Sequence, residues 1–410
     1  MSSVIRHSSS VKPIIVPMLA NVTSDNIDRC TSFVPATSQP EEKLYELGRR
    51  VSMATDKDTL EATLTVSQLE YGELDNLYAL AGLSAEPVGG LELDDFDDAR
   101  TDFYLPGKDA YGGTLEQTLW LEKMALDSLE IAINAKERLV RTMNFSGDFC
   151  KIARYGNKYL IFKTEDVGSG VSGAHAIVLS DPAPVVDPNN AGIYILKVVR
   201  IRSGVATELV ITTDYTWTNG TTTLTILSAL TSDHYRIWYT AASYGTAGDP
   251  TELNDSDPYY LKADNVTVTI DDGTHDPVTL DKLTALTISA TLNRTDEGAI
   301  GSDENLFRDV ESYDVALRFD GFVKNSTIQE ALMAQAGQSW TLIDYSLFDA
   351  VDIVVKVYTD ATKTTFACGF KITGCTFSDD SPSYEANANA TEGVSLSSDN
   401  LLLTEDVSNL

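Results

Sequence analysis

The sequence predicts a mainly β protein with two similar β-barrel or β-sandwich domains, each with a short helix, and a small β domain between them. Three observations support this prediction. Thr, Ser, Val and Ile recur in alternating runs, which are typical of half-buried strands. A unit of strand, loop, strand and helix occurs twice, and a series of short strands separates the two occurrences. The 410 residues are enough for several domains.

The later unit runs from Leu283 to Gly337. Its first strand, Leu283–Leu292, alternates apolar and polar residues, and a second alternating strand spans Tyr313–Asp320. Ser326 or Thr327 can cap the helix that follows, and Gly337 can end it. This pattern predicts a half-buried sheet with one covering helix.

The same unit is expected near the N-terminus. Ala62–Val66 has the alternation of Val315–Phe319, and both helices are expected to end in Ala-Gly. Each unit then continues with an apolar strand, which is Leu129–Ile133 in the first unit and Val351–Tyr358 in the second. Pattern and spacing therefore predict an internal duplication.

The predicted domains span residues 1–165, 166–258 and 259–410. Strands of the middle domain begin with Ile193–Ile201, and Asn219-Gly220 is a strong signal for a hairpin turn. A series of about four or five strands fits an immunoglobulin-like or related small sandwich.

Gly168 to Gly173 matches the Gly-x-Gly-x-x-Gly spacing of a dinucleotide-binding loop. Such a loop needs a helix directly after it, so that the helix N-terminus can receive phosphate. A predicted strand, Ala174–Leu179, follows instead. The segment is therefore interpreted as a flexible linker.

The net charge of the chain is -31. Binding to nucleic acid phosphates without regard to sequence needs clustered Lys and Arg, so this charge argues against it. The acidic side chains could hydrate a surface at high salt, line a passage to which DNA must not adhere, or keep the chain soluble. The four cysteines include no Cys-x-x-Cys pair, which favours the reduced state. No run of about 18 apolar residues is present, so no membrane span is predicted.

A search for reactive groups finds no motif of a known kind. The four histidines lie far apart, and no Gly-x-Ser-x-Gly, P-loop or Cys/His motif is present. The carboxylates are too numerous for any two to be chosen as acid and base, so a carbohydrate-active enzyme stays an alternative. We expect no catalytic residue, no cofactor and no metal site.

A long acidic segment, Leu83 to Gly113, follows the first helix and lacks a helix or strand pattern. Loops of this length are usually functional or disordered. The ligand spacing of a calcium loop is missing. Its aromatic residues favour a contact between subunits. The residues that carry this interpretation are Asp94, Asp95, Phe96, Asp97, Asp98, Phe103, Tyr104 and Tyr111.

Three stretches resemble a known family, the tail tube proteins of tailed phages and archaeal viruses. They are the segment around Tyr45 and Gly48 before a strand and a helix, the closing run Phe366–Ser381 with a last strand after it, and the pattern from Asp214 to Thr240. The last of these is similar to small β domains that are appended to or inserted in viral tail and fibre proteins. The resemblance implies a β-barrel or sandwich tube fold flanked by one helix.

The resemblance also implies partners and a location. Tube subunits form stacked rings whose inner sheet lines a DNA channel; most members have one tube domain and form hexamers, and some have two and form trimers with pseudo-sixfold symmetry. The expected partners are copies of the chain itself, other tail proteins, and viral DNA that passes through the lumen without specific binding. The expected location is the virion tail, assembled in the host cytoplasm, with no membrane contact.

Within this family the excess of acidic residues would let DNA slide past the channel wall, although a halophilic host would also explain this excess. Leu83 to Gly113 would be an inter-ring arm, and the middle domain an outer decoration. The alternative is a viral fibre, decoration or cell-surface binding protein made of tandem β domains. That alternative predicts neither an internal duplication nor assembly into hollow tubes.

Overall fold

The computed structural model describes residues 6–7, 13–17, 25–27, 29–38, 41–44, 54–57, 61–69, 72–109, 115–147, 149–152, 154–155, 158–159, 161–180, 195–203, 205–218, 221–241, 261–271, 273–274, 276–280, 283–298, 305–322, 350–380 and 391–410. Within these residues the protein is mainly β, as predicted, and α1 (Asp75–Leu80) is the one α-helix. Tyr111 and the predicted helix that ends at Gly337 lie outside the described residues.

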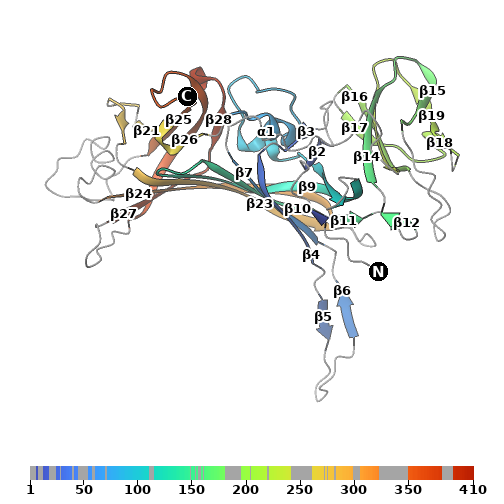
Figure 1. The fold of residues 1–410 in the computed structure, drawn as a ribbon, viewed down its shortest axis with the longest axis horizontal. Coiled ribbons are helices and arrows are strands. Elements are labelled where there is room, and N and C mark those ends of the chain that lie inside the picture. The colour runs from blue at the N-terminus through green and yellow to red at the C-terminus, as the bar shows by residue number, and fades with distance from the viewer. Residues whose placement is uncertain are drawn as a thin grey trace.

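One large antiparallel sheet runs through both halves of the chain (Figure 1). Side chains alternate between its faces, so that every second residue of a strand is buried. From edge to edge, the strands are β4 (Cys30–Ser38), β7 (Glu61–Leu69), β10 (Val140–Gly147), β9 (Leu115–Asn134), β23 (Leu283–Gly298), β24 (Asn305–Phe322), β27 (Thr391–Ser398) and β26 (Phe366–Asp380).

Shorter strands form a second layer on the apolar side of this sheet, together with α1 (Figure 1). In the first half these strands are β1 (Arg6–His7), β2 (Ile14–Pro17), β3 (Asp25–Asn26), β8 (Thr101–Asp109) and β11 (Phe149–Ile152). In the second half they are β21 (Val266–Asp271), β22 (Val278–Thr279), β25 (Val351–Tyr358) and β28 (Leu402–Thr404). The long strands β9 and β26 each take part in both layers.

The two halves repeat one topology. β2 pairs with β3 and β8, β8 pairs with β9, and β11 pairs with β9; β21, β22, β25, β26 and β28 pair in the same way. The order β4-β7-β10-β9 in the large sheet matches β23-β24-β27-β26. Eight strands of the first half therefore have counterparts, in the same chain order, in the second.

A β-bulge occurs at the same place in both halves. In β9 it leaves Asp127 without an opposite residue on β10, and in β26 it leaves Ser378 without one on β27. Bulges are specific features of a fold rather than random defects. The shared bulge aligns the two halves residue by residue, with Ser128 of β9 equivalent to Asp379 of β26.

One expected match between the halves is wrong. The counterpart of β25 is β8, not Leu129–Ile133, which belongs to β9. The interpretation of Leu83 to Gly113 as a loop without regular structure is also wrong, since it contains β8 and a 3-10 helix, η2 (Leu93–Phe96). Asp102 and Gly107 interrupt the apolar alternation of β8, which forms because β2 and β9 supply its hydrogen-bonding partners.

The space between the layers is filled by one hydrophobic core to which both halves contribute. Leu64 and Phe145 come from the first half, and Ile288, Leu317 and Leu396 from the second. α1 packs into the same core: Asp75 lies in its first turn, where a negative charge favours the helix, and Gly82 follows its end with φ of 75°.

A small sandwich lies at one end of the molecule (Figure 1). Its own core separates two sheets. The first contains β14 (Ile161–Gly168), β20 (His234–Ala241), β16 (Ile195–Arg202) and β17 (Val205–Glu208), and the second contains β15 (Gly173–Val178), β19 (Thr223–Ala229) and β18 (Tyr215–Trp217). β14 belongs to this sandwich although it begins before residue 166, the expected boundary.

Gly168 to Gly173 is a turn inside the small sandwich rather than a linker between domains. It connects β14 to β15, and the backbone N–H of Ser169 donates to the carbonyl of Asp233 at 2.8 Å. Gly170 and Gly173 have φ of 61° and 101°, values that glycine adopts without steric cost. The glycines therefore allow the chain to reverse direction in a tight turn.

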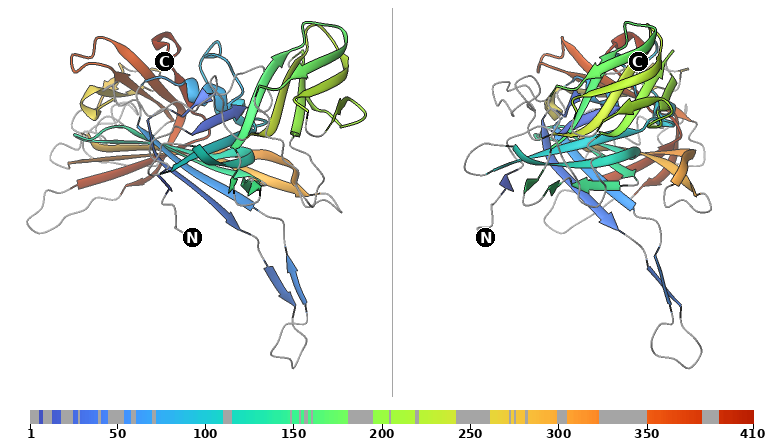
Figure 2. Two further views of the ribbon diagram at one scale, coloured as in Figure 1. Left: turned by 45° about the vertical axis from the view of Figure 1, so that its right-hand side comes forward. Right: turned by 90° about the vertical axis from the view of Figure 1, so that its right-hand side faces the viewer.

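Two short hairpins form separate two-stranded sheets. β12 (Arg154–Tyr155) pairs with β13 (Lys158–Tyr159), and β5 (Glu41–Leu44) pairs with β6 (Ala54–Lys57). The β5–β6 hairpin continues from the ends of β4 and β7 and projects away from the body (Figure 2).

Candidate functional site

The face of the large sheet opposite the core is dominated by hydroxyl side chains. Thr65 on β7 donates to Asn144 on β10 at 2.8 Å, and Asn144 donates to Ser128 on β9 at 2.9 Å. Such pairs across strands stabilise a sheet. The register places the following residues on this face: Thr63, Thr65, Ser67, Ser128, Thr142, Asn144, Ser146, Thr287, Ser289, Thr291, Ser395 and Ser397.

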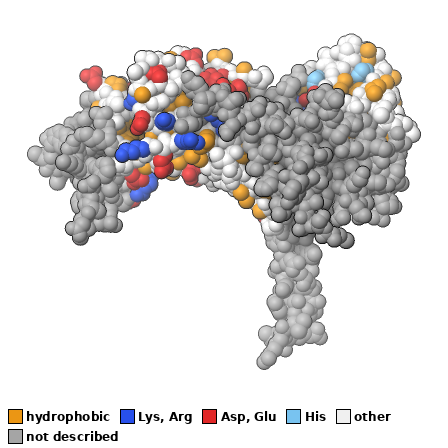
Figure 3. Space-filling model, viewed as in Figure 1, with side chains coloured by type: hydrophobic (Ala, Val, Ile, Leu, Met, Phe, Trp, Pro, Cys, Tyr) orange, Lys and Arg blue, Asp and Glu red, His pale blue; other side chains and the backbone are white. Residues whose placement is uncertain are grey.

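Charged residues are sparse along the central strands of this hydroxyl face. Three charged residues lie directly opposite hydroxyl residues of β23. Glu130 on β9 is opposite Ser289, and on β24 Asp314 is opposite Thr291 and Arg318 is opposite Thr287. On the side of the molecule drawn in Figure 3, acidic and basic side chains of the second half lie next to one another. Glu61, Asp320 and Asp379 lie on the same face as Glu130 and Asp314, so its described charges are mainly acidic.

The large sheet has two open edges. Among the described residues, β4 pairs only with β7, and Thr376–Asp380 of β26 pairs only with β27. Val34 on β4 is 55% exposed. An open edge presents unpaired N–H and C=O groups to another strand. The site is therefore a polar face that ends in two strands available for pairing.

The two open edges are equivalent to two strands that pair inside the chain. β9 of the first half pairs with β23 of the second, with Ser128 opposite Thr291. β26 is the counterpart of β9, and β4 is the counterpart of β23. Asp379 of β26 corresponds to Ser128 of β9, because each directly follows the shared bulge. Following the register from these residues across each half shows that Ser38 of β4 corresponds to Thr291 of β23.

The structure buries three aromatic residues that were expected to be exposed anchors. Phe96, Phe103 and Tyr104 are 1%, 0% and 2% exposed. Phe103 packs edge-to-face against Phe33 and Phe145, with ring centroids 6.2 and 4.9 Å away. The expectation is wrong for Phe103 and Tyr104 because alternate residues of β8 point into the layers on either side of it. It is wrong for Phe96 because this residue, at the end of η2, packs into the main core. A direct role for the segment between rings stays a prediction.

The acidic part of this segment binds the second half of the same chain. Arg294 on β23 donates to the backbone carbonyls of Phe96 and Asp97, both at 2.9 Å, and to that of Leu126 at 3.0 Å. The Tyr313 hydroxyl donates to the Asp97 carboxylate. Burial raises the pKa of Tyr313, and this hydrogen bond raises it further, so the phenol stays protonated as a donor.

A second contact holds the segment at its other end. Leu91 and Leu403 exchange backbone hydrogen bonds of 2.8 and 2.9 Å. Thr404 and Asn409 both donate to the Glu86 carboxylate. Asp94 and Asp98 are exposed, and Asp95 is half-buried. The segment therefore links the two halves, while its outward carboxylates face solvent.

Replacing Arg294 with alanine should destabilise this link. Three backbone carbonyls would lose a charged donor, and the expected loss is about 2–4 kcal/mol of unfolding free energy. Urea unfolding of the purified chain measures it. Arg318→Ala is the matched control, because Arg318 lies half exposed beside Asp320 on the surface, and little change is expected. Equal effects of the two substitutions would contradict the assigned role of Arg294.

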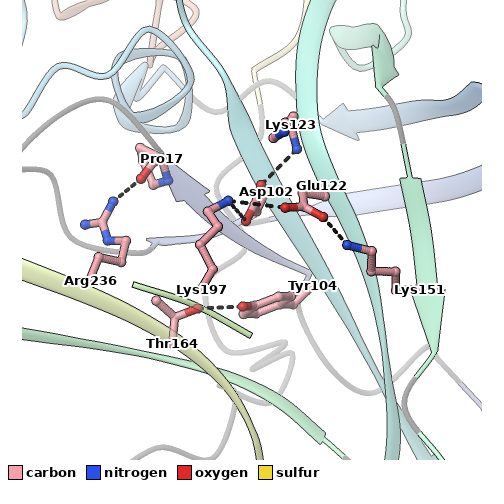
Figure 4. Close-up of polar contacts among 9 residues, drawn as sticks. All are labelled: Pro17, Asp102, Tyr104, Glu122, Lys123, Lys151, Thr164, Lys197 and Arg236. Carbon is pink, nitrogen blue, oxygen red and sulfur yellow. Dashed lines mark hydrogen bonds and ion pairs between the residues drawn. The ribbon is translucent and has the colours of Figure 1, made fainter. Parts of the chain in front are cut away.

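The small sandwich packs directly on the body of the protein. Trp120 and Tyr104 of the body form one apolar cluster with Trp238 and Phe162 of the sandwich. The Tyr104 and Thr164 hydroxyls are 2.6 Å apart, and Arg236 donates to the carbonyl of Pro17 (Figure 4). Arg236 also donates to Asp166 at 2.6 Å. The sandwich is thus held by both apolar and polar contacts.

No group of three or more metal-ligating side chains occurs among the described residues. The described cysteines are all free thiols. No helix in the part of the chain that the structure covers is long and apolar enough to cross a membrane. Sequence reasoning missed the open edges and the site under the small sandwich, since both depend on pairing between distant strands.

Neither a protein-family model nor a curated protein matches the sequence. The chain is similar to a component of the baseplate of the anti-feeding prophage, with 12% identity over 34% of this chain and 92% of that one, and a TM-score of 0.27. It is similar to a component of the sheath–tube complex of an extracellular contractile injection system (PVC) in the extended state, with 11% identity over 36% and 94% of the chains and a TM-score of 0.28. A third similar chain comes from the tube-terminating cap of the anti-feeding prophage, with 12% identity over 40% and 99% of the chains and a TM-score of 0.27. These scores lie below the level at which a likeness indicates a shared function, so the function is inferred from the geometry of this chain.

Proposed function

We propose that this protein is the repeating subunit of a viral tail tube, assembled as stacked rings around a channel for DNA. The observation that carries the proposal is the pair of open sheet edges, β4 and β26, which are counterparts of the strands that join the two halves internally. A contact that repeats head to tail between copies forms a ring when its rotation closes. Closure also removes both open edges, which otherwise invite uncontrolled association.

The internal junction bears on the symmetry of such a ring. If the junction between chains rotates each half by the same angle as the junction within a chain, every half occupies an equivalent place in the ring. A ring of three chains then has six such places, and it has pseudo-sixfold symmetry. The repeated topology supports the equivalence of the halves, and the resemblance to tail tube proteins implies the number of three chains. A ring of six chains with twelve places is the alternative.

The hydroxyl face is the side of the sheet that fits a channel wall. The second layer, α1 and the small sandwich lie on the other side, which would become the outside of the ring (Figures 1 and 2). Phosphate binding requires clustered Lys and Arg, and the central strands present mainly Ser and Thr. Such a wall would let DNA slide without being held.

One further feature supports stacking. The β5–β6 hairpin projects from the ends of β4 and β7, so it has the reach to touch a neighbouring ring (Figure 2). The proposed role needs no reaction, cofactor or metal ion. The subunits would assemble in the host cytoplasm with other tail proteins and leave it in the virion.

The direct test is a cysteine pair across the proposed junction. Ser38→Cys and Asp379→Cys are introduced into a chain whose Cys30 and Cys150 are replaced by serine. Directly opposite residues of antiparallel strands have Cβ atoms about 4.5–5.5 Å apart, close to the range of a disulfide. Mild oxidation should give covalent dimers and larger species on a denaturing gel, and negative-stain microscopy should show rings or hollow tubes.

Val34→Cys with Asp379→Cys is the matched control, because it shifts the pair four residues out of register along β4. It should give far less cross-linking. A strictly monomeric protein without rings or tubes would refute the proposal, and equal cross-linking by both pairs would refute the register.

A further inference from the structure

A lysine and two carboxylates meet in a buried site between the small sandwich and the body (Figure 4). The Nζ atom of Lys197 on β16 lies 3.8 Å from Oδ2 of Asp102 on β8, and 3.4 Å from Oε1 of Glu122 on β9. The three residues are 4%, 0% and 7% exposed. The Trp238 ring covers the ammonium group, with Nζ 4.4 Å from the ring centroid. The site is therefore nearly closed to water.

We propose that Lys197 and Asp102 become joined by an amide bond between Nζ and Cγ, with Glu122 as the residue that transfers the proton. The bond would connect the small sandwich covalently to the body. It concerns the chain itself and is independent of the function proposed above.

The carboxyl group of Asp102 is held in a fixed orientation. Its Oδ1 accepts a hydrogen bond of 2.9 Å from the backbone N–H of Lys123. Its Oδ2, which faces Lys197, is buried and has no hydrogen-bond partner within the described part of the chain. Burial raises the pKa of Asp102, and the nearby Glu122 charge adds to this effect although Lys197 opposes it. The protonated acid, which is the form that an amine can attack, is thereby favoured.

Glu122 is placed to accept a proton from the amine. Burial alone would raise its pKa, but Lys197 and Lys151 lower the pKa overall, so that Glu122 is a carboxylate. Lys151 donates to Oε2 of Glu122, which leaves Oε1 directed at Lys197. The second lysine therefore orients the base without competing for Asp102.

The reaction is a condensation that needs no oxidant or other reagent. Lys197 gives one proton to Glu122, and the neutral amine attacks Cγ of protonated Asp102 to form the C–N bond. The proton on Glu122 then passes to the departing oxygen, Oδ2, as the amine loses its second proton to Glu122. The C–Oδ2 bond breaks and one water molecule leaves. Glu122 ends as the protonated acid, because it keeps the extra proton that the charged amine brought. Fixed proximity of the two groups in a dry site is the main source of rate.

The test is the intact mass of the denatured full-length chain after the folded protein has been incubated. The expected mass is lower, by one water molecule, than the mass expected from the sequence. Lys197→Arg provides the reference, because it keeps the positive charge but cannot form this amide. Tryptic digestion should give a branched peptide in which 101–108 is joined to 164–200, since trypsin does not cleave after a modified lysine.

Glu122→Gln should keep the packing and leave the chain at its full mass, which separates a chemical role from a structural one. Lys163→Arg is the matched control, since Lys163 lies near Glu165 away from the site, and it should lose water as the unaltered chain does. A folded natural chain at full mass would overturn the proposal. A loss of water that persists in Lys197→Arg or in Glu122→Gln would overturn the assignment of these residues.

Discussion

A chain that lacks residues 83–113 is expected not to fold. The deletion removes β8, which pairs with β9 and β2, and it removes the buried rings of Phe96, Phe103 and Tyr104. It also leaves Arg294 without two of its backbone acceptors. The loss exceeds the stability of an ordinary domain, which is about 5–15 kcal/mol. Soluble yield and the circular dichroism spectrum of the purified product measure the effect.

A milder variant separates folding from assembly at the same segment. Asp94→Asn with Asp98→Asn changes two exposed carboxylates and leaves the buried residues intact. This chain should fold as the natural one does, and fewer or shorter tubes would support contact between rings through these carboxylates. A soluble, folded deletion chain would contradict the structural role assigned to β8.

Replacing Phe103 with alanine is expected to lower the unfolding free energy by about 3–5 kcal/mol. The ring is fully buried, and its edge-to-face contacts with Phe33 and Phe145 would be lost together with its apolar contacts. Urea unfolding, followed by tryptophan fluorescence, gives the midpoint and the slope. The slope should stay unchanged, because the surface exposed on unfolding stays nearly the same.

Val88→Ala is the control for this substitution. Val88 lies in the same segment of the chain and is fully exposed, so the expected change is below about 0.5 kcal/mol. A Phe103→Ala chain with natural stability but without assembly would place the ring at a contact between subunits. That result would support the contact between subunits that the sequence predicted for this acidic, aromatic segment.

The alternation of apolar and polar residues predicted several strands well. Ala62–Val66 lies in β7, and Leu283–Leu292 and Tyr313–Asp320 lie in β23 and β24. Alternation is a local property, because successive side chains of any strand point to opposite faces. It therefore appears in the sequence wherever one face of the sheet is buried and the other is polar.

β8 and the turn at Gly168 show where local patterns fail. Thr101, Phe103 and Tyr104 favour a strand, but Asp102 and Gly107 interrupt the alternating pattern of β8. β8 is a strand because its neighbours complete its hydrogen bonds. Gly168 to Gly173 was interpreted as a linker because a predicted strand, not a helix, follows it, whereas here positive φ angles close a turn. In both cases a partner far away in the sequence selects the conformation.

Local periodicity was enough to predict a mainly β chain whose strands alternate apolar and polar residues, with similar strand pairs in its two halves. The matching bulges, the two open edges and the meeting of Lys197 with Asp102 became visible only in three dimensions. Each depends on the register between strands that are distant in the sequence, and a shift of one residue would turn every side chain to the other face. No local pattern records that register, because many registers bury the same alternating residues.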